Sequence, residues 1–178
     1  MTHLFGLCRN LTGRLCNRML LAVLAATVFV SCGTQFVERP APDVTFVTIK
    51  GETIPLNAMR GKVVLVNFWA TDCAICLKEM PQLIATHRKF EARGYETVAV
   101  AMRHDPPLRV VHYVENNPLP FKVAFDPVGE HAKAFDDVKL TPTTFIIDRR
   151  GVIVQRILGE PNFGKLEALI EAKLNEKI

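Results

Sequence analysis

Two cysteines separated by two residues carry the clearest chemical signal in this sequence. They occur as Cys73-Ala74-Ile75-Cys76, where a near-continuous apolar run gives way to a helical pattern. Cysteines three positions apart on a first helical turn can reach disulfide distance, and the free N–H groups of a helix start favour a thiolate on the first cysteine. We therefore predict that Cys73 is a nucleophile and that Cys76 is the buried thiol that resolves a mixed disulfide.

Metal binding is one alternative for a cysteine pair of this spacing, and two buried, inert thiols are another. Structural zinc needs four ligands, and the sequence has no second C-x-x-C. The histidines that follow the N-terminal region form no tight pair that would complete such a site: His87, His104, His112 and His131. We therefore expect no resident metal and no other cofactor.

Strands and helices alternate around the cysteine pair and must position it. Apolar runs and period-two alternation predict strands at 62–69, 95–102, 121–125, 143–148 and 152–158, with an N-terminal hairpin of 43–47 and 53–56. Helical spacing predicts helices from Asp72 as N-cap to Gly94, from Asp105 as cap to about Asn117, at 128–135 and at 163–177. This order indicates an α/β fold with a mixed central sheet and helices on both faces.

The N-terminal part of the chain differs in composition from the rest. The first 31 residues contain three arginines, no Asp or Glu, and an apolar run at 19–30 that is too short to span a membrane. The segment FVSC, ending at Cys32, resembles the lipobox of bacterial lipoproteins. We predict a signal peptide at 1–31, lipid attachment at Cys32, a tether over 32–42 and a folded domain at 43–178, held at a membrane on the periplasmic side of the cell envelope. Because Phe29 stands where a lipobox usually has an aliphatic residue, an ordinary signal-peptidase cut and an uncleaved anchor remain alternatives.

Charge and cysteine usage narrow the class of function. Three of the 22 basic residues lie in the predicted signal peptide, so 19 remain against 18 acidic residues. A nearly neutral domain lacks the basic patch that nucleic-acid binding requires. With Cys32 acylated, Cys73 and Cys76 are the remaining thiols of the exported part, whereas a domain stabilised by disulfides would carry several along its length. One close pair indicates redox chemistry.

Two segments of the chain resemble a known family. KVVLVNFWATDCAIC with residues 77–81, and LTPTTFIID at 140–148, resemble the thioredoxin-like TlpA/ResA/DsbE family of membrane-tethered thiol-disulfide oxidoreductases. The resemblance covers position 43 to the C-terminus and implies a thioredoxin fold with an N-terminal hairpin and a central insertion at about 124–135. It implies an enzyme that reduces protein disulfides through the Cys73/Cys76 dithiol. Because the surroundings of an exported protein are oxidising, such a reductant needs a membrane electron donor. We expect the protein to act as a monomer.

The resemblance also implies roles for individual residues. Pro142 is the cis-proline that faces the disulfide, and Thr141 before it offers backbone groups to an extended substrate. Glu79 is the acidic residue close to the pair that influences proton transfer. Apart from the resemblance, we place Trp69 and Asp72 beside the substrate, with packing as the alternative for Trp69. Without the resemblance, Pro142 is an ordinary trans proline and Glu79 a solvated charge.

Three positions differ from more common patterns. Asn67 stands where thioredoxin has a buried Asp, so we expect that proton relay to be absent. Asp72 and Ile75 replace the family's usual Trp and Pro. A carboxylate about 6 Å from the Cys73 sulfur would oppose the thiolate by up to ~3 kcal/mol at an effective dielectric near 20. This predicts a more reducing pair with a slower thiol, whereas Ile75 has no effect of predictable sign.

Two other functions fit a cysteine pair in a thioredoxin fold. In a Cu(I)-binding metallochaperone the two thiolates would hold the soft cation, although such proteins usually have wider cysteine spacing and a partner histidine. A peroxidase would need a threonine and arginine pattern that activates peroxide, and the sequence shows none. Disulfide reduction is therefore the leading hypothesis, and copper binding is its alternative.

Overall fold

Strand β4 forms the centre of the fold. The computed structural model describes residues 36–177, and β4 (Val63–Trp69) has all seven of its residues buried. It pairs in parallel with β5 (Tyr95–Ala101) and antiparallel with β7 (Thr143–Ile147), which confirms the predicted mixed sheet. Its Val, Phe and Trp side chains suit a strand that is covered on both faces.

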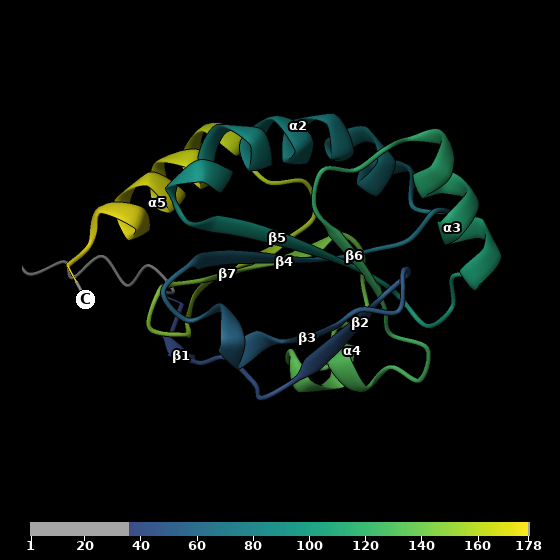
Figure 1. Cartoon of the computed structure of the whole chain (residues 1–178), viewed down its shortest axis with the longest axis horizontal. Helices are drawn as coiled ribbons and strands as arrows, with labels where there is room; N and C mark the ends of the chain where they lie inside the picture. The colour runs from purple at the N-terminus through teal and green to yellow at the C-terminus, as the bar shows by residue number, and fades with distance from the viewer. Residues whose placement is uncertain (1–35, 178) are drawn as a thin grey trace, which may run out of the picture. The chain divides into compact units, whose positions relative to one another are not determined.

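The sheet has eight strands in the order β1-β8-β7-β4-β5-β6-β2-β3 (Figure 1). The other strands are β1 (Arg39–Pro40), β2 (Thr45–Thr48), β3 (Thr53–Pro55), β6 (Lys122–Phe125) and β8 (Val152–Leu158). The α-helices are α2 (Ala74–Phe90), α3 (Pro107–Asn116), α4 (Glu130–Ala134) and α5 (Phe163–Asn175), and the short 3-10 turns are η1 (Leu56–Met59) and η2 (Glu91–Arg93). The predicted α/β architecture, hairpin and central insertion are therefore all present.

Helices cover both faces of the sheet. Helices α2 and α5 lie over one face, and α4 lies against the other (Figure 1). Alternating side chains of β4 supply the two cores, because successive residues of a strand point to opposite faces. Leu65 and Trp69 pack in the core under α2 and α5, whereas Val66 and Phe68 pack in the core that includes Phe135. Asn67 therefore lies on the α2 face of the sheet.

Several elements end or begin at the same edge of the sheet. Strand β4 ends at Trp69, just before α2. Strand β7 begins with Thr143 opposite Phe68, and β8 ends with Leu158 opposite Thr143. The cysteine segment before α2 and the Pro142 loop before β7 thus lie at one end of the sheet, which we call the cysteine end.

The folded domain begins before the predicted position 43. Arg39 and Pro40 form strand β1, which pairs with Ile153 and Val152 of β8, and the Ala41 N–H donates to the Gly151 carbonyl at 2.9 Å. Residues from 36 onward belong to one compact unit. The last part of the predicted tether is therefore part of the sheet. Proline is acceptable at this position because β1 is an edge strand.

Other predictions for the N-terminal part lie outside the described residues. These are the signal peptide at 1–31 and lipid attachment at Cys32. Among residues 36–177, no helix has the length and apolar character needed to cross a membrane.

Asp105 does not cap α3 as predicted. The N-cap of α3 is Pro106, which makes no side-chain cap bond, and Pro107 starts the helix. The Asp105 carboxylate instead accepts two hydrogen bonds of 2.6 Å, from the backbone N–H and from the hydroxyl of Thr71. These bonds fasten the segment before the cysteines to the loop that follows β5.

Candidate active site

Cys73 and Cys76 form a disulfide at the N-terminus of α2. Their Cα atoms are 5.2 Å apart. Cys73 is the N-cap of the helix, and its sulfur accepts a hydrogen bond of 3.2 Å from the Cys76 N–H. The prediction that Asp72 caps this helix is therefore wrong by one residue. The cap places the Cys73 sulfur among free helical N–H groups, which stabilise a thiolate there once the disulfide is reduced.

The two sulfurs differ in their access to a partner molecule. Cys76 is fully buried in the core between α2 and the sheet, whereas Cys73 is half-buried. Ile75, between them, has half of its surface exposed. The unequal burial of the two cysteines is the one that the sequence predicts, while their roles as nucleophile and resolving thiol stay a prediction.

The Pro142 loop lies at the same end of the sheet as the disulfide. The Thr141–Pro142 peptide bond is cis. The loop is held by the Gly159 N–H, which donates to the Pro142 carbonyl at 2.9 Å, and by the Thr143 hydroxyl, which donates to the Leu140 carbonyl at 2.7 Å. Within residues 36–177, the backbone N–H and C=O of Thr141 have no hydrogen-bond partner. They are available to a peptide.

Glu79 is a buried carboxyl group one turn along α2 from Cys76. None of its surface is exposed. Burial raises the pKa of the Glu79 carboxyl from its ordinary 4.5 to about 7, although a hydrogen bond from Asn67 lowers it and the nearby Glu160 carboxylate raises it. A carboxyl group with this pKa gains and loses a proton near neutral pH, so it suits general acid–base chemistry.

Comparison with known proteins places the domain in a family. The Redoxin family profile matches residues 36–170. The chain belongs to the Redoxin family. Thiol-disulfide oxidoreductase ResA of Bacillus thuringiensis subsp. konkukian (strain 97-27) is 34% identical over 133 residues, which are 75% of this chain and 76% of the relative. ResA of Geobacillus kaustophilus (strain HTA426) is 32% identical over 158 residues, 86% of this chain and 90% of the relative.

A solved structure agrees with this assignment. The thiol:disulfide interchange protein of Chlorobium tepidum TLS, a thioredoxin family protein, has a TM-score of 0.71 and 25% identity, and the match covers 79% of this chain and 99% of that one. This Redoxin-family protein is thus a thiol-disulfide oxidoreductase with a thioredoxin fold. The Cys73–Cys76 pair supplies its redox site.

The Redoxin fold places the two remaining predicted substrate-binding residues differently. Trp69 is fully buried and packs against Tyr113, with ring centroids 5.4 Å apart. This burial favours the packing alternative for Trp69, and its contact with substrate stays a prediction. Asp72 is exposed beside the cysteines, and its carboxylate lies 3.6 Å from the His104 ring. His104 and Asp72 thus form part of the rim of the site.

Asn67 is a site residue whose contribution the sequence analysis missed. Its side-chain nitrogen donates to Glu79 Oε1 and to the Thr144 hydroxyl, both at 3.0 Å. A polar amide in an otherwise apolar buried strand was the available signal, because a buried polar group needs a partner. Periodicity on α2 also places Glu79 beside buried Met80. Neither signal reveals that the two side chains meet.

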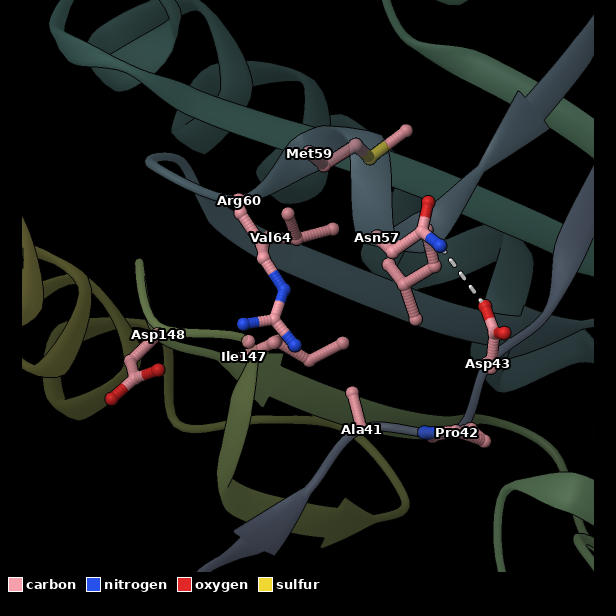
Figure 2. Close-up of a pocket in the computed structure, with 11 residues that line it drawn as sticks. Ala41, Pro42, Asp43, Asn57, Met59, Arg60, Val64, Ile147 and Asp148 are labelled. Carbon is pink, nitrogen blue, oxygen red and sulfur yellow. Dashed lines mark hydrogen bonds between the residues drawn. The ribbon is translucent and has the colours of Figure 1, made fainter.

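The pocket in Figure 2 lies at the opposite end of the sheet from the disulfide. Val64 at the start of β4 and Ile147 at the end of β7 line it, together with Arg60 and the Asp43 carboxylate, which accepts a 3.2 Å hydrogen bond from Asn57 (Figure 2). Its volume of about 240 Å³ is below the roughly 300–1,000 Å³ of most small-molecule sites. The thiol chemistry does not involve this pocket.

The described part of the chain contains no ready-made metal site. No three His, Cys, Asp or Glu side chains of residues 36–177 gather closely enough to hold an ion. A Cu(I) ion bound by this pair would therefore have only the two sulfurs as protein ligands here.

Proposed function

We propose that this protein reduces disulfide bonds of protein substrates outside the cytoplasm, with Cys73 as attacking thiolate and Cys76 as resolving thiol. The observation that carries the proposal is the difference in exposure between the two cysteines. Cys73 caps α2 at a half-buried position, and Cys76 is fully buried behind it. A nucleophile must be reached by its target, whereas a resolving thiol acts only after the target is attached.

The reaction transfers two electrons and two protons from the reduced enzyme to the substrate. The Cys73 thiolate attacks one substrate sulfur, the substrate disulfide breaks, and the leaving sulfur takes a proton. Cys76 then loses its proton and attacks Cys73. This releases the second substrate thiol and forms the Cys73–Cys76 disulfide seen in the structure.

Glu79 is the group that receives the Cys76 proton in this proposal. Both side chains are fully buried, so solvent cannot take the proton directly. Glu79 follows Cys76 by three positions, a spacing that brings side chains together on one face of a helix. Its pKa of about 7 allows it to accept the proton and release it near neutral pH.

The surface around the disulfide suits a polypeptide substrate. Large aliphatic side chains are exposed at the cysteine end of the sheet, with half or more of their surface accessible: Ile75, Leu108, Leu140 and Leu158. Exposed apolar side chains near one site favour contact with a partner protein. The unpaired backbone groups of Thr141, next to the cis-proline Pro142, can pair with an extended segment of that partner.

The proposed place of the reaction rests on the sequence beyond the described residues, and its direction rests on that place and on Asp72. The apolar run at 19–30 and Cys32 support export and lipid attachment at a membrane. The surroundings outside the cytoplasm are oxidising, so net reduction requires an electron donor in the membrane. Asp72 favours the reducing direction because its charge disfavours the Cys73 thiolate, an effect weakened by its exposure.

Reduction of insulin by the full chain, with dithiothreitol as electron source, tests this function. We expect activity well above the dithiothreitol background, and its loss on Cys73→Ser. Cys32→Ser is the matched control, because it removes a thiol and the predicted lipid site while leaving the redox pair intact. It should retain reductase activity and lose the membrane association of the cellular protein. Activity that survives Cys73→Ser would overturn the proposed mechanism.

Trapping with Cys76→Ser tests the order of the two sulfurs. This variant should accumulate a mixed disulfide between Cys73 and substrate that dithiothreitol releases. If the Cys73→Ser variant traps substrates through Cys76 instead, the assignment of nucleophile and resolving thiol is reversed.

A further inference from the structure

A buried polar cluster connects β4, β7 and α2 behind the disulfide. Asn67 uses both hydrogens of its Nδ2, one toward Glu79 Oε1 and one toward the Thr144 hydroxyl, and each contact is 3.0 Å long. All three side chains are fully buried. Among residues 36–177, Asn67 Oδ1 and Glu79 Oε2 have no hydrogen-bond partner. Two buried acceptors without partners lower the stability of the folded protein, which indicates that this polar cluster has a function besides packing.

The chemistry of an amide explains why Asn suits this position. An ionised carboxylate only accepts hydrogen bonds, whereas a protonated carboxyl group also donates one. The Asn side chain has a donor on one side and an acceptor on the other, and a half-turn of its terminal torsion exchanges them. The Thr144 hydroxyl can likewise accept or donate. Asn67 can therefore match Glu79 in either state without changing its own protonation, whereas an ionised Asp only accepts hydrogen bonds and Leu forms none.

We propose that Asn67 is a positioning residue that serves Glu79 in both protonation states. Its Nδ2 donates to the ionised carboxylate, as in the structure, and after a half-turn its Oδ1 accepts from the protonated carboxyl group. In the turned state the Thr144 hydroxyl donates to the same Oδ1. The cluster thus keeps the Glu79 carboxyl in one place while a proton arrives and leaves.

This inference rests on the proposed function, in which Glu79 accepts the Cys76 proton. In that step the proton moves from the Cys76 sulfur to the Glu79 carboxylate, and the sulfur electron pair forms the bond to Cys73. The bond between Cys73 and the substrate breaks, and the substrate sulfur leaves with its electrons. In this reaction step Asn67 contacts neither sulfur, so its effect on the reaction passes through Glu79.

Few charged groups lie close enough to Glu79 to shift the pKa of its carboxyl group. The Glu160 carboxylate, in the loop before α5, is the charge whose field reaches it. Lys78 pairs with Glu160 at 2.9 Å and partly offsets that field. Strands β4 and β7 contribute the uncharged Asn67 and Thr144, and α2 contributes the Cys76 thiol when the pair is reduced.

The test follows Glu79 and Asn67 by NMR across a pH titration of the full-length oxidised protein, in which neither cysteine of the pair titrates. We expect the Glu79 carboxyl carbon and the Asn67 side-chain NH₂ resonances to change together, near pH 7. Asn67→Asp keeps the volume of the side chain at this position. In this variant the midpoint of the Glu79 titration curve should move up by about one pH unit or more, because the Glu79 carboxylate loses its hydrogen-bond donor. Asn67→Leu should shift it in the same direction.

Two further variants separate a positioning role from a structural one. Thr86→Val removes another buried hydroxyl of α2, which donates to Glu167 at 3.2 Å, so it should lower stability without moving the inflection. In the reduced protein, the insulin reduction rate of Asn67→Asp should fall about fivefold or more at pH 7 relative to wild type and recover at pH 9. Loss of rate at both pH values would indicate a structural defect and overturn the inference.

The outcomes distinguish this inference from the proposed role of Glu79. If Glu79→Gln leaves the pH profile of insulin reduction unchanged, the role of Glu79 fails, and the inference fails with it. If Glu79→Gln removes the inflection but neither Asn67 variant moves it, Glu79 keeps its role and the inference about Asn67 alone is wrong. An Asn67 NH₂ resonance that does not respond to the titration would also overturn it.

Discussion

Replacing Glu79 by Gln should change how the stability of the oxidised protein depends on pH. The Glu79 side chain is fully buried, and its pKa is raised to about 7, chiefly by burial. In the unfolded chain the carboxyl group has an ordinary pKa near 4.5. The folded state therefore holds a proton through a range in which the unfolded state has released it.

The sign and size of the effect follow from this difference. The contribution of the protonated group is fully present below pH 4.5 and is lost as the pH rises through about 7. At about 1.4 kcal/mol per pH unit, the difference between the two pKa values corresponds to a loss of about 3 kcal/mol in the free energy of unfolding. Gln keeps the amide acceptor for Asn67 and carries no charge, so Glu79→Gln should remove this loss.

Urea denaturation of the oxidised wild type and variant from pH 4 to pH 8 measures the difference. The free energy of unfolding of Glu79→Gln, relative to wild type, should rise by about 3 kcal/mol across this range. Glu115→Gln is the control, since it makes the same chemical change at an exposed position of α3 and should give a flat difference. A difference for Glu79→Gln that is flat, or that falls with pH, would refute the argument from burial.

Three other substitutions test the packing and electrostatics of the fold by urea denaturation. Phe135→Ala, which empties a fully buried site in an aromatic cluster, should cost about 3–5 kcal/mol. Asp105→Ala leaves two Thr71 donors without their acceptor and should cost about 2–3 kcal/mol. The Asp126 carboxylate, 3.3 Å from His131 Nδ1, is the main cause of the raised pKa of His131, so the stabilising effect of this pair is present below pH 6.5 and lost as pH rises through that raised pKa. His131→Phe should remove this pH dependence, and a variant that retains it would contradict the assignment.

Local sequence was sufficient to predict the central elements of the fold. The apolar run at 62–69 corresponds to β4 (Val63–Trp69), and 152–158 matches β8 (Val152–Leu158) without change. The apolar composition of the first segment also predicts the burial of β4, whose seven residues are all buried, whereas β8 is only partly buried. The C-x-x-C at a strand-to-helix junction likewise predicted the position and the unequal burial of the two cysteines, which the structure reproduces.

Contacts between distant parts of the chain were not predictable in this way. Asp105 has the residue type of a helix cap, yet it binds Thr71 across 34 positions of sequence. Asp72 is a better N-cap by statistics than Cys73, but the helix starts one residue later and the sulfur takes the cap bond. The Asn67–Glu79 bond depends on which face of β4 meets α2, and that is a property of the assembled sheet.

The position of strand β1 indicates where the oxidoreductase can be attached to a support without covering its redox site. It joins β8 at Val152 and Ile153, whereas the Pro142 loop adjoins the other end of β8, where Leu158 pairs with Thr143. A tag or surface linker placed ahead of Phe36 is therefore attached to the domain across the length of the sheet from the sulfurs. Protein immobilised through such a linker should present its dithiol to molecules in the surrounding liquid.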